Sequence, residues 1–261
     1  MAEAALPEAG GLSPPSPLLL LAEGRALLEV GFGIITAPAM RLAPKGDGHT
    51  VLVLPGFLAS DRSTSHLRDV LARLGHTAVG WDLGRNLGGI GRLRQALQQR
   101  LTQLHHVSNR RVSLVGWSLG GVLARDLAYH MPEKVRRVIT LGSPFNGDIS
   151  ANNVRRLYEQ LSGEQVKIRP TLEAASRIAG DIGVPATAIY TRTDGVVNWR
   201  TCVLTPGPHA ENIEILGASH MALGFNAAAV WAVADRLAQP EGAFARFRRR
   251  GPFAAGYGEI S

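Results

Sequence analysis

The fold of this chain is decided by the stretch Val112-Ser113-Leu114-Val115-Gly116-Trp117-Ser118-Leu119-Gly120-Gly121. Residues 112–116 have the composition of a buried strand and residues 122–129 that of a helix, so Ser118 lies on a turn between the two. A tight turn of this kind strains the serine backbone and projects its hydroxyl, while the flanking glycines allow close backbone packing. In this setting the pattern Gly-x-Ser-x-Gly predicts that Ser118 is a nucleophile. The alternative is a glycine-rich start of a helix in which Ser118 is only an N-cap.

Length and composition indicate one large globular domain. The 261 residues are 45% hydrophobic and 19% charged, which allows a substantial core and argues against wholesale disorder. Cys202 is the only cysteine in the sequence, so an intrachain disulfide and a cysteine-based metal site are both excluded. We interpret Cys202 as a small buried side chain.

The net charge of +7 comes almost entirely from arginine. Most arginines are spread along predicted helices, and no helix-turn-helix, zinc-finger or RNA-binding signature accompanies them, so we expect no nucleic-acid partner. The segment 241–261 is the exception, because it gathers Arg246, Arg248, Arg249 and Arg250. We predict a solvated basic C-terminal tail there, with contact to an anionic membrane or polyanion as the alternative.

Residues 1–48 are predicted to form an N-terminal leader and an amphipathic helix from Leu18 to about Phe32. The start of the chain is proline-rich and lacks the basic region of a secretory signal. Three charges interrupt the apolar run that follows: Glu23, Arg25 and Glu29. Each would cost about 3 kcal/mol at the centre of a bilayer, so we expect no spanning helix and a cytoplasmic location. The apolar side chains expected to cover a core or a pocket mouth are Leu20, Leu27, Leu28 and Ile34. Weak peripheral contact with a membrane is the alternative.

The predicted core, residues 49–240, alternates between short apolar runs and helical patterns. The predicted strands are 51–54, 78–82, 112–116, 135–141, 186–190 and 213–216. The continuous apolar run 51–54 is typical of a strand buried on both faces. The alternation of strands with helices predicts an α/β fold with a doubly wound, mostly parallel sheet. Between about 148 and 183 the pattern has helices without a strand, which predicts an inserted helical lid. The glycines between Gly84 and Gly91 do not fit a nucleotide-binding pattern, and we expect a mobile loop there.

An acid and a histidine follow the last two predicted core strands. Asp194 comes after 186–190, and His220 comes after 213–216. A serine hydroxyl needs a base and a group that orients the base, and the carboxyl ends of parallel strands meet at one edge of a sheet. We therefore predict a catalytic triad of Ser118, Asp194 and His220. Alternatively, Asp194 lies in a plain turn, and His220 caps the last helix or is a satisfied core side chain. The spacing of the histidines and carboxylates predicts no metal site.

The turn at Ser118 and the order Ser118, Asp194, His220 resemble the α/β-hydrolase superfamily over roughly residues 50–237. Two loops are similar to those of its bacterial lipase and esterase branch: Leu54-Pro55-Gly56-Phe57 and Leu141-Gly142-Ser143-Pro144-Phe145. The resemblance implies an oxyanion hole of two backbone N–H groups, which fall on Leu119 and Phe57 in this chain. Many lipases have His-Gly where this chain has Pro55-Gly56.

These features predict a serine esterase or lipase that forms an acyl-enzyme and needs no cofactor. Trp117 and Phe145, close to the nucleophile, are predicted to line the substrate pocket. The apolar residues of the lid are expected to favour an apolar or lipid-like small-molecule ester: Leu157, Leu161, Leu172, Ile178 and Ile182. The same triad would also support an acyltransferase, a thioesterase or an amidase. A binding protein without catalysis is a further alternative.

Overall fold

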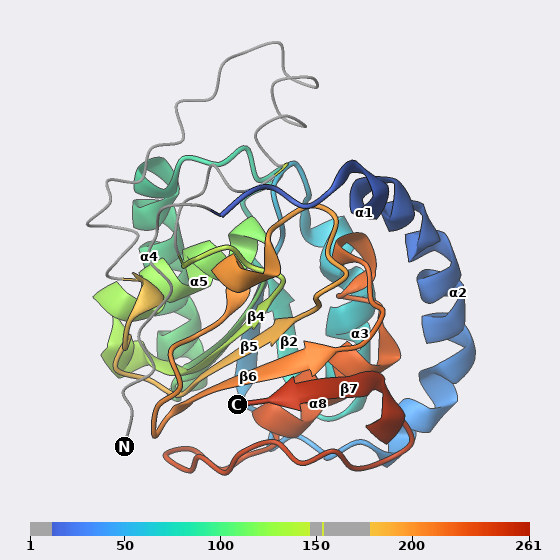
Figure 1. The fold of residues 1–261 in the computed structure, drawn as a ribbon. Helices are drawn as coiled ribbons and strands as arrows, with labels where there is room; N and C mark the ends of the chain where they lie inside the picture. The colour runs from blue at the N-terminus through green and yellow to red at the C-terminus, as the bar shows by residue number, and fades with distance from the viewer. Residues whose placement is uncertain (1–11, 147–152, 154–177) are drawn as a thin grey trace, which may run out of the picture.

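A seven-stranded sheet forms the centre of the fold (Figure 1). The computed structural model describes residues 12–146, 153 and 178–261. The strand order is β2-β1-β3-β4-β5-β6-β7, and all neighbours are parallel except the antiparallel pair β6 and β7. The strands are β1 Thr50–Leu54, β2 Thr77–Gly80, β3 Val112–Trp117, β4 Val135–Leu141, β5 Ala186–Tyr190, β6 Ala210–Ile215 and β7 Tyr257–Ile260. The prediction of a mostly parallel α/β sheet is confirmed.

Helices cover both faces of this sheet, as a doubly wound fold requires. One face is covered by α4 (Ile90–Ser108) and α5 (Leu119–His130), and the other by α3 (Ser65–Arg73) and α8 (Ala227–Leu237). The N-terminal helices are α1 Pro17–Ala22, η1 Glu23–Arg25, α2 Ala26–Thr36 and η2 Ala37–Leu42. The other short 3-10 helices are η3 Asp61–Thr64, η4 Pro132–Lys134, η6 Trp199–Cys202, η7 His220–Ala222 and η8 Ala254–Gly256.

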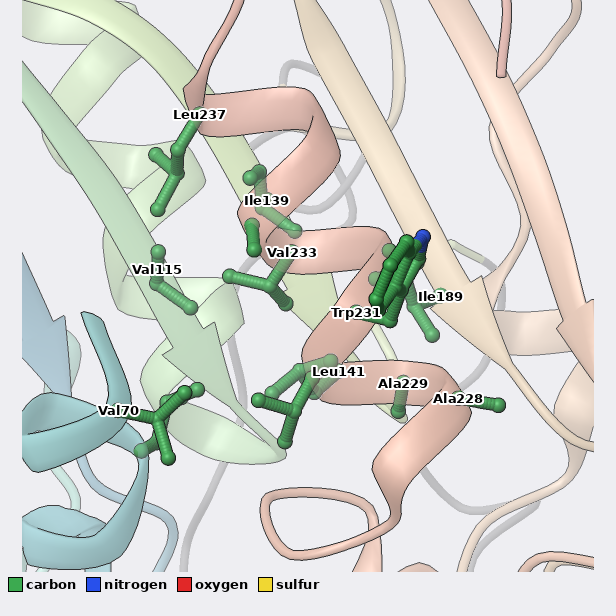
Figure 2. Close-up of a cluster of buried hydrophobic side chains, with 14 of the residues drawn as sticks. Val70, Val115, Ile139, Leu141, Ile189, Ala228, Ala229, Trp231, Val233 and Leu237 are labelled. Carbon is green, nitrogen blue, oxygen red and sulfur yellow. The ribbon is translucent and has the colours of Figure 1, made fainter. Parts of the chain in front are cut away.

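Each face of the sheet has its own apolar cluster, because the strands are buried on both faces and successive side chains alternate between them. In β1, Val51 and Val53 belong to the cluster under α3 and α8, whereas Leu52 and Leu54 belong to the cluster under α4 and α5. Side chains of α8 pack against those of the central strands in the first cluster (Figure 2). The sheet is therefore a rigid support for the loops at the carboxyl ends of its strands.

The predicted lid falls almost entirely outside the described residues. Leu157, Leu161 and Leu172 are among the residues that the structure does not describe. Ile178 and Ile182 are described, and both are buried in the cluster under α4 and α5. The lid and the domain limits therefore stay predictions.

The N-terminal helices expose their leucines and bury a carboxylate, which is the reverse of the prediction. Helical structure extends from Pro17 through η1 to Thr36, and Arg25 forms the expected ion pair with Glu29 at 3.6 Å. However, Leu27 is 82% exposed and Leu28 78%, whereas Glu23 is only 8% exposed. The prediction that the leucines cover a core is wrong, because the carboxylates of this segment accept hydrogen bonds from loops of the sheet. No helix within the described residues is both long and apolar enough to cross a bilayer.

The C-terminal segment belongs to the sheet and is not a solvated tail. In the antiparallel pairing of β7 with β6, Ile260 lies opposite Ile213. Phe247 and Tyr257 are buried, and the Tyr257 hydroxyl donates a hydrogen bond to the carbonyl of Ala228 at 2.8 Å. The arginines of the segment are exposed: Arg246, Arg248, Arg249 and Arg250. The interpretation from charge failed because the aromatic side chains, not the arginines, determine how this segment packs.

Candidate active site

Ser118 lies at a sharp turn between β3 and α5. Its backbone has φ 52° and ψ −124°, outside the regions that residues with a side chain prefer. Two glycines permit this turn. A Cβ on Gly116 would stand 2.3 Å from the Cα of Gly121, and one on Gly120 would stand 2.2 Å from the carbonyl oxygen of Leu54. The strained turn with closely packed glycines is present as predicted.

The structure brings Ser118, His220 and Asp194 together at the carboxyl edge of the sheet. With its proton on Nδ1, His220 donates to Asp194 Oδ2 at 2.7 Å and accepts from the Ser118 hydroxyl at Nε2 at 3.0 Å. All three side chains are buried. The geometry is that of a nucleophile, a base and an orienting acid.

The acid of this group is held firmly by its own loop. Asp194 Oδ1 accepts hydrogen bonds from the backbone N–H groups of Val196 at 2.8 Å and Val197 at 2.7 Å. Oδ2 is thereby left for the histidine. This arrangement is an Asx turn, which fixes the orientation of the carboxylate before any substrate binds.

The electrostatic environment favours the charged form of His220. Burial alone would lower the pKa of His220, but the charge of Asp194, its hydrogen bond and the charge of Glu23 together raise the pKa above its ordinary value of 6.5. The imidazolium that forms when a base takes a proton would therefore be stabilised at this position. In the sequence, Glu23 stands out only as a charge that interrupts an apolar run.

A glycine at the end of β4 makes room for the Asp194–His220 pair. Gly142 has φ +53°, and a Cβ there would stand 3.1 Å from His220 Nδ1 and 2.8 Å from the side chain of Leu223. Gly142 lies in one of the loops that carry the resemblance to lipases, but its contact with the pair depends on the tertiary structure.

The loop after β1 lies beside the serine, as an oxyanion hole would require. A Cβ on Gly56 would stand 3.3 Å from the Cβ of Ser118, and Leu119 is the first residue of α5. The first N–H groups of a helix have no partner within the helix, which suits them to bind a negative oxygen. The two donors, on Phe57 and Leu119, stay a prediction.

Asn86 holds the loop after β1 in place. This fully buried side chain donates to the carbonyl of Pro55 at 2.8 Å and accepts from the N–H of Gly88 at 3.1 Å, and its backbone carbonyl accepts from the N–H of Leu58 at 2.7 Å. The segment that we expected to be a mobile loop is thus attached to the core at Asn86. In the sequence, Asn86 stands out only as an asparagine among glycines. Its hydrogen bonds to Pro55 and Gly88 become visible only in the fold.

The two predicted pocket residues are both buried. Trp117 Nε1 donates to the backbone carbonyl of His220 at 3.1 Å, and its ring packs edge-on against Phe225. The Phe145 ring lies under the guanidinium of Arg125, 4.4 Å from the ring centre. Trp117 therefore supports the loop of the histidine. Contact of either ring with a substrate stays a prediction.

Among the described residues, one group of side chains has the composition of a metal site, with ligand atoms within 4.8 Å of one another: Asp47, His49 and His76. It lies at the amino ends of β1 and β2, at the opposite edge of the sheet from Ser118. Arg110 and Arg136 already bind the Asp47 carboxylate, at 2.6 Å and 2.8 Å. These guanidiniums would repel a cation, so we assign no metal to this group.

The parallel sheet, its covering helices and the strained serine turn define the α/β-hydrolase fold. The chain is similar to lipases of known structure that share this fold. Aspergillus fumigatus lipase B is 16% identical with a TM-score of 0.56, covering 74% of this chain and 53% of the lipase. Paleococcus ferrophilus monoacylglycerol lipase is 13% identical with a TM-score of 0.51, covering 75% of this chain and 96% of the lipase.

Within this fold, the chain belongs to the palmitoyl protein thioesterase family, whose model matches residues 51–182. A short segment is also similar to the biotin biosynthesis bifunctional protein BioHC of Teredinibacter turnerae, with 43% identity over 47 residues. That match spans 18% of this chain and only 8% of the bifunctional protein.

Proposed function

We propose that this chain is a serine hydrolase that cleaves carboxylic esters of apolar acyl groups through Ser118, His220 and Asp194. The observation that carries the proposal is the continuous hydrogen-bonded chain from Asp194 Oδ2 through His220 to Ser118 Oγ, with distances of 2.7 Å and 3.0 Å. The strained backbone of Ser118 supports it, because strain of this kind is concentrated at functional sites.

In the proposed mechanism, Ser118 Oγ attacks the ester carbonyl while His220 Nε2 takes the hydroxyl proton. The carbonyl electron pair moves onto oxygen, and the N–H groups of Leu119 and Phe57 would stabilise that negative oxygen. When the bond to the leaving alcohol breaks, the imidazolium returns the proton to the alcohol. Water then attacks the acyl-enzyme by the same steps, releases the acid and regenerates Ser118. Asp194 stabilises the imidazolium throughout.

A thioester substrate is the second candidate, and the family match favours it. The attack on the carbonyl is the same. However, a thiolate, whose conjugate acid has a pKa of about 8.5, leaves with less help from a proton than an alkoxide does. Hydrolysis of a thioester would therefore depend less on the histidine as a proton donor.

The test compares esters and thioesters that carry the same acyl groups, from butyryl to palmitoyl, for wild type and Ser118→Ala. Ser65→Ala is the matched control, since its hydroxyl bonds only the carbonyl of Arg62 at 2.9 Å in the described contacts. We expect Ser118→Ala to lose activity and labelling by a fluorophosphonate, and Ser65→Ala to keep both. The ratio of kcat/KM for matched substrates decides between ester and thioester. Equal slow hydrolysis by wild type and Ser118→Ala, without labelling of Ser118, would refute the proposal.

We further propose that the N-terminal helices bind the surface of an anionic lipid bilayer through the apolar face of residues 17–42. The exposed apolar side chains of this segment are Leu18, Leu20, Leu21, Leu27, Leu28, Phe32, Ile34, Ile35 and Leu42. Patches of this kind on a protein surface commonly mark sites of interaction. Both acids of the segment turn toward the protein. The exposed Arg41 lies at the C-terminal end of the segment and the exposed Lys45 just beyond it, which suits a negatively charged surface. In Figure 1 these helices lie along one side of the molecule.

Sedimentation with vesicles of phosphatidylcholine and phosphatidylserine tests this contact. Leu28→Glu combined with Ile35→Glu is expected to weaken binding at least tenfold, since two apolar contacts of more than about 1 kcal/mol each are replaced by charges. Val107→Glu, which replaces an exposed apolar side chain of α4 by the same charge, is the control and is expected to reduce binding less. Wild type that stays in the supernatant at low salt, or a dimer in solution that the double variant dissociates, would overturn the assignment to a bilayer.

A further inference from the structure

The N-terminal helices bind the backbone of the two loops that carry the candidate acid and the candidate histidine. They do so through three charged side chains, here called the N-terminal polar cluster: Glu23, Arg25 and Glu29. Glu23 Oε1 accepts from the N–H of Gly195 at 2.8 Å and from the N–H of His220 at 3.0 Å. Its Oε2 accepts from the N–H of Met221 at 3.0 Å. One carboxylate thus joins the residue after the acid to the histidine itself.

The other two members of the cluster bind the same two loops. The Arg25 guanidinium donates to the carbonyls of Thr193 at 2.8 Å and Ala218 at 2.7 Å. Glu29 accepts from the N–H of Ser219 at 2.8 Å and lies 3.6 Å from Arg25. Each of these backbone contacts falls within two positions of the candidate acid or histidine. The cluster therefore adds to the contacts that set the spacing between the two loops, which are also joined by the Asp194–His220 pair and by hydrogen bonds from the Thr191 and Thr193 hydroxyls to the carbonyl of Ala218 at 3.2 Å and 2.8 Å.

Backbone packing brings the helices close enough for these contacts. A Cβ on Gly195 would stand 2.2 Å from the carbonyl oxygen of Leu19, and a Cβ on Gly33 would stand 2.4 Å from the carbonyl oxygen of Phe225. Since no larger side chain fits at either glycine without a shift, the helices lie directly against the loops. A glycine of the loop (Gly195) and a glycine of the helix (Gly33) both permit this close contact.

A buried anion at this position does more than connect loops. Glu23 is buried, and buried carboxylates are rare unless they are paired. An amide side chain in its place would offer one acceptor oxygen, which is too little for three N–H donors. The charged groups that act on His220 are Asp194, from the loop after β5, and Glu23, from η1, and both favour the imidazolium.

We propose that Glu23 is a positioning residue for the reaction: it holds the loops of Asp194 and His220 at the spacing that proton transfer needs, and places a negative charge beside the imidazolium that forms. This inference rests on the proposed function, because it requires that His220 takes the proton of Ser118. The N-terminal helices are then part of the catalytic unit although they touch no reacting atom.

The experiment compares Glu23→Gln with Glu133→Gln, which alters an exposed glutamate of η4. For Glu23→Gln we expect kcat to fall about 10- to 100-fold with little change in KM, because geometry is disturbed and no substrate contact is removed. The acid limb of the pH profile of kcat/KM is expected to move to lower pH, since a charge that favours the imidazolium is gone. Glu133→Gln is expected to match wild type in both respects. Glu29→Gln serves if Glu23→Gln does not fold, because it weakens the acceptors of the Ser219 N–H and the Asn226 amide. It should lower kcat by a smaller factor and leave the acid limb in place, since Glu29 is not among the charges that act on His220. Wild-type kcat in a folded Glu29→Gln would contradict the positioning role of the cluster.

The pKa of His220, measured by NMR titration of its ring signals, separates failure of this inference from failure of the proposed function. Wild type that neither hydrolyses esters or thioesters nor labels at Ser118 refutes the function, while a lower His220 pKa in Glu23→Gln still reports the contact. A folded Glu23→Gln with wild-type kcat and an unmoved acid limb overturns the inference. A fall in kcat without any change in the acid limb or in the pKa of His220 overturns it too, because that result means a purely structural role.

Discussion

Replacing Asp194 by asparagine tests the hydrogen-bonded chain at its most specific point. Oδ1 of Asp194 accepts from the N–H groups of Val196 at 2.8 Å and Val197 at 2.7 Å, while Oδ2 faces His220 Nδ1 at 2.7 Å. An amide has one oxygen, and these two N–H groups already require it, so the asparagine NH2 group turns toward the histidine. It then donates to Nδ1, the ring proton moves to Nε2, and no base faces Ser118.

The expected loss is large. An asparagine that imposes the wrong histidine tautomer lowers kcat by about 10⁴-fold in the best-studied triad, which corresponds to about 5 kcal/mol of transition-state stabilisation. The assay is kcat for a p-nitrophenyl ester at pH 8, with Ser118→Ala as the background. The thermal unfolding midpoint should stay close to that of wild type, because both backbone hydrogen bonds are kept. If Asp194→Asn retains more than about a tenth of the wild-type kcat, Asp194 is not the orienting acid.

Three further changes test other parts of the molecule. Gly142→Ala adds a Cβ 3.1 Å from His220 Nδ1 at φ +53°, and should cost about 1–3 kcal/mol of stability and reduce kcat; an unchanged urea midpoint and kcat would contradict the packing. Asn86→Ala removes the side-chain hydrogen bond to Pro55 in the loop after β1 and the one to Gly88. It should lower kcat between about 10- and 100-fold if the loop after β1 supplies an oxyanion donor, and a wild-type kcat would contradict that assignment. Burial lowers the pKa of His49 from 6.5 to about 4 in the folded protein. As the pH falls from 6.5 to about 4, the unfolded state therefore binds a proton that the folded state does not, and about 3 kcal/mol of stability should be lost over that pH range. His49→Gln should reduce this loss in urea unfolding at several pH values, and the exposed His106→Gln should not; equal behaviour of both variants speaks against His49.

The sequence by itself determined the six parallel strands of the sheet and the order of the candidate triad, but not β7. The fully apolar run 51–54 is typical of a strand buried on both faces, and the predicted strands 135–141 and 186–190 matched β4 and β5 at both ends. Ser118, Asp194 and His220 each follow such a run, so the rule that parallel strands present their carboxyl ends at one edge was enough to bring them together. These predictions depend only on local composition and chain order.

Only the tertiary structure decided which way the N-terminal helices face and what supports the triad. A hydrophobic pattern assigns leucines inward and charges outward, but the loops of Asp194 and His220 present backbone N–H and carbonyl groups that Glu23 and Arg25 satisfy. Burying a paired carboxylate there satisfies N–H groups that the leucines could not. The contacts of Asn86 and Gly142 likewise join segments that are distant in the chain. Local sequence carries no record of such partners, because they exist only once the sheet has brought the loops together.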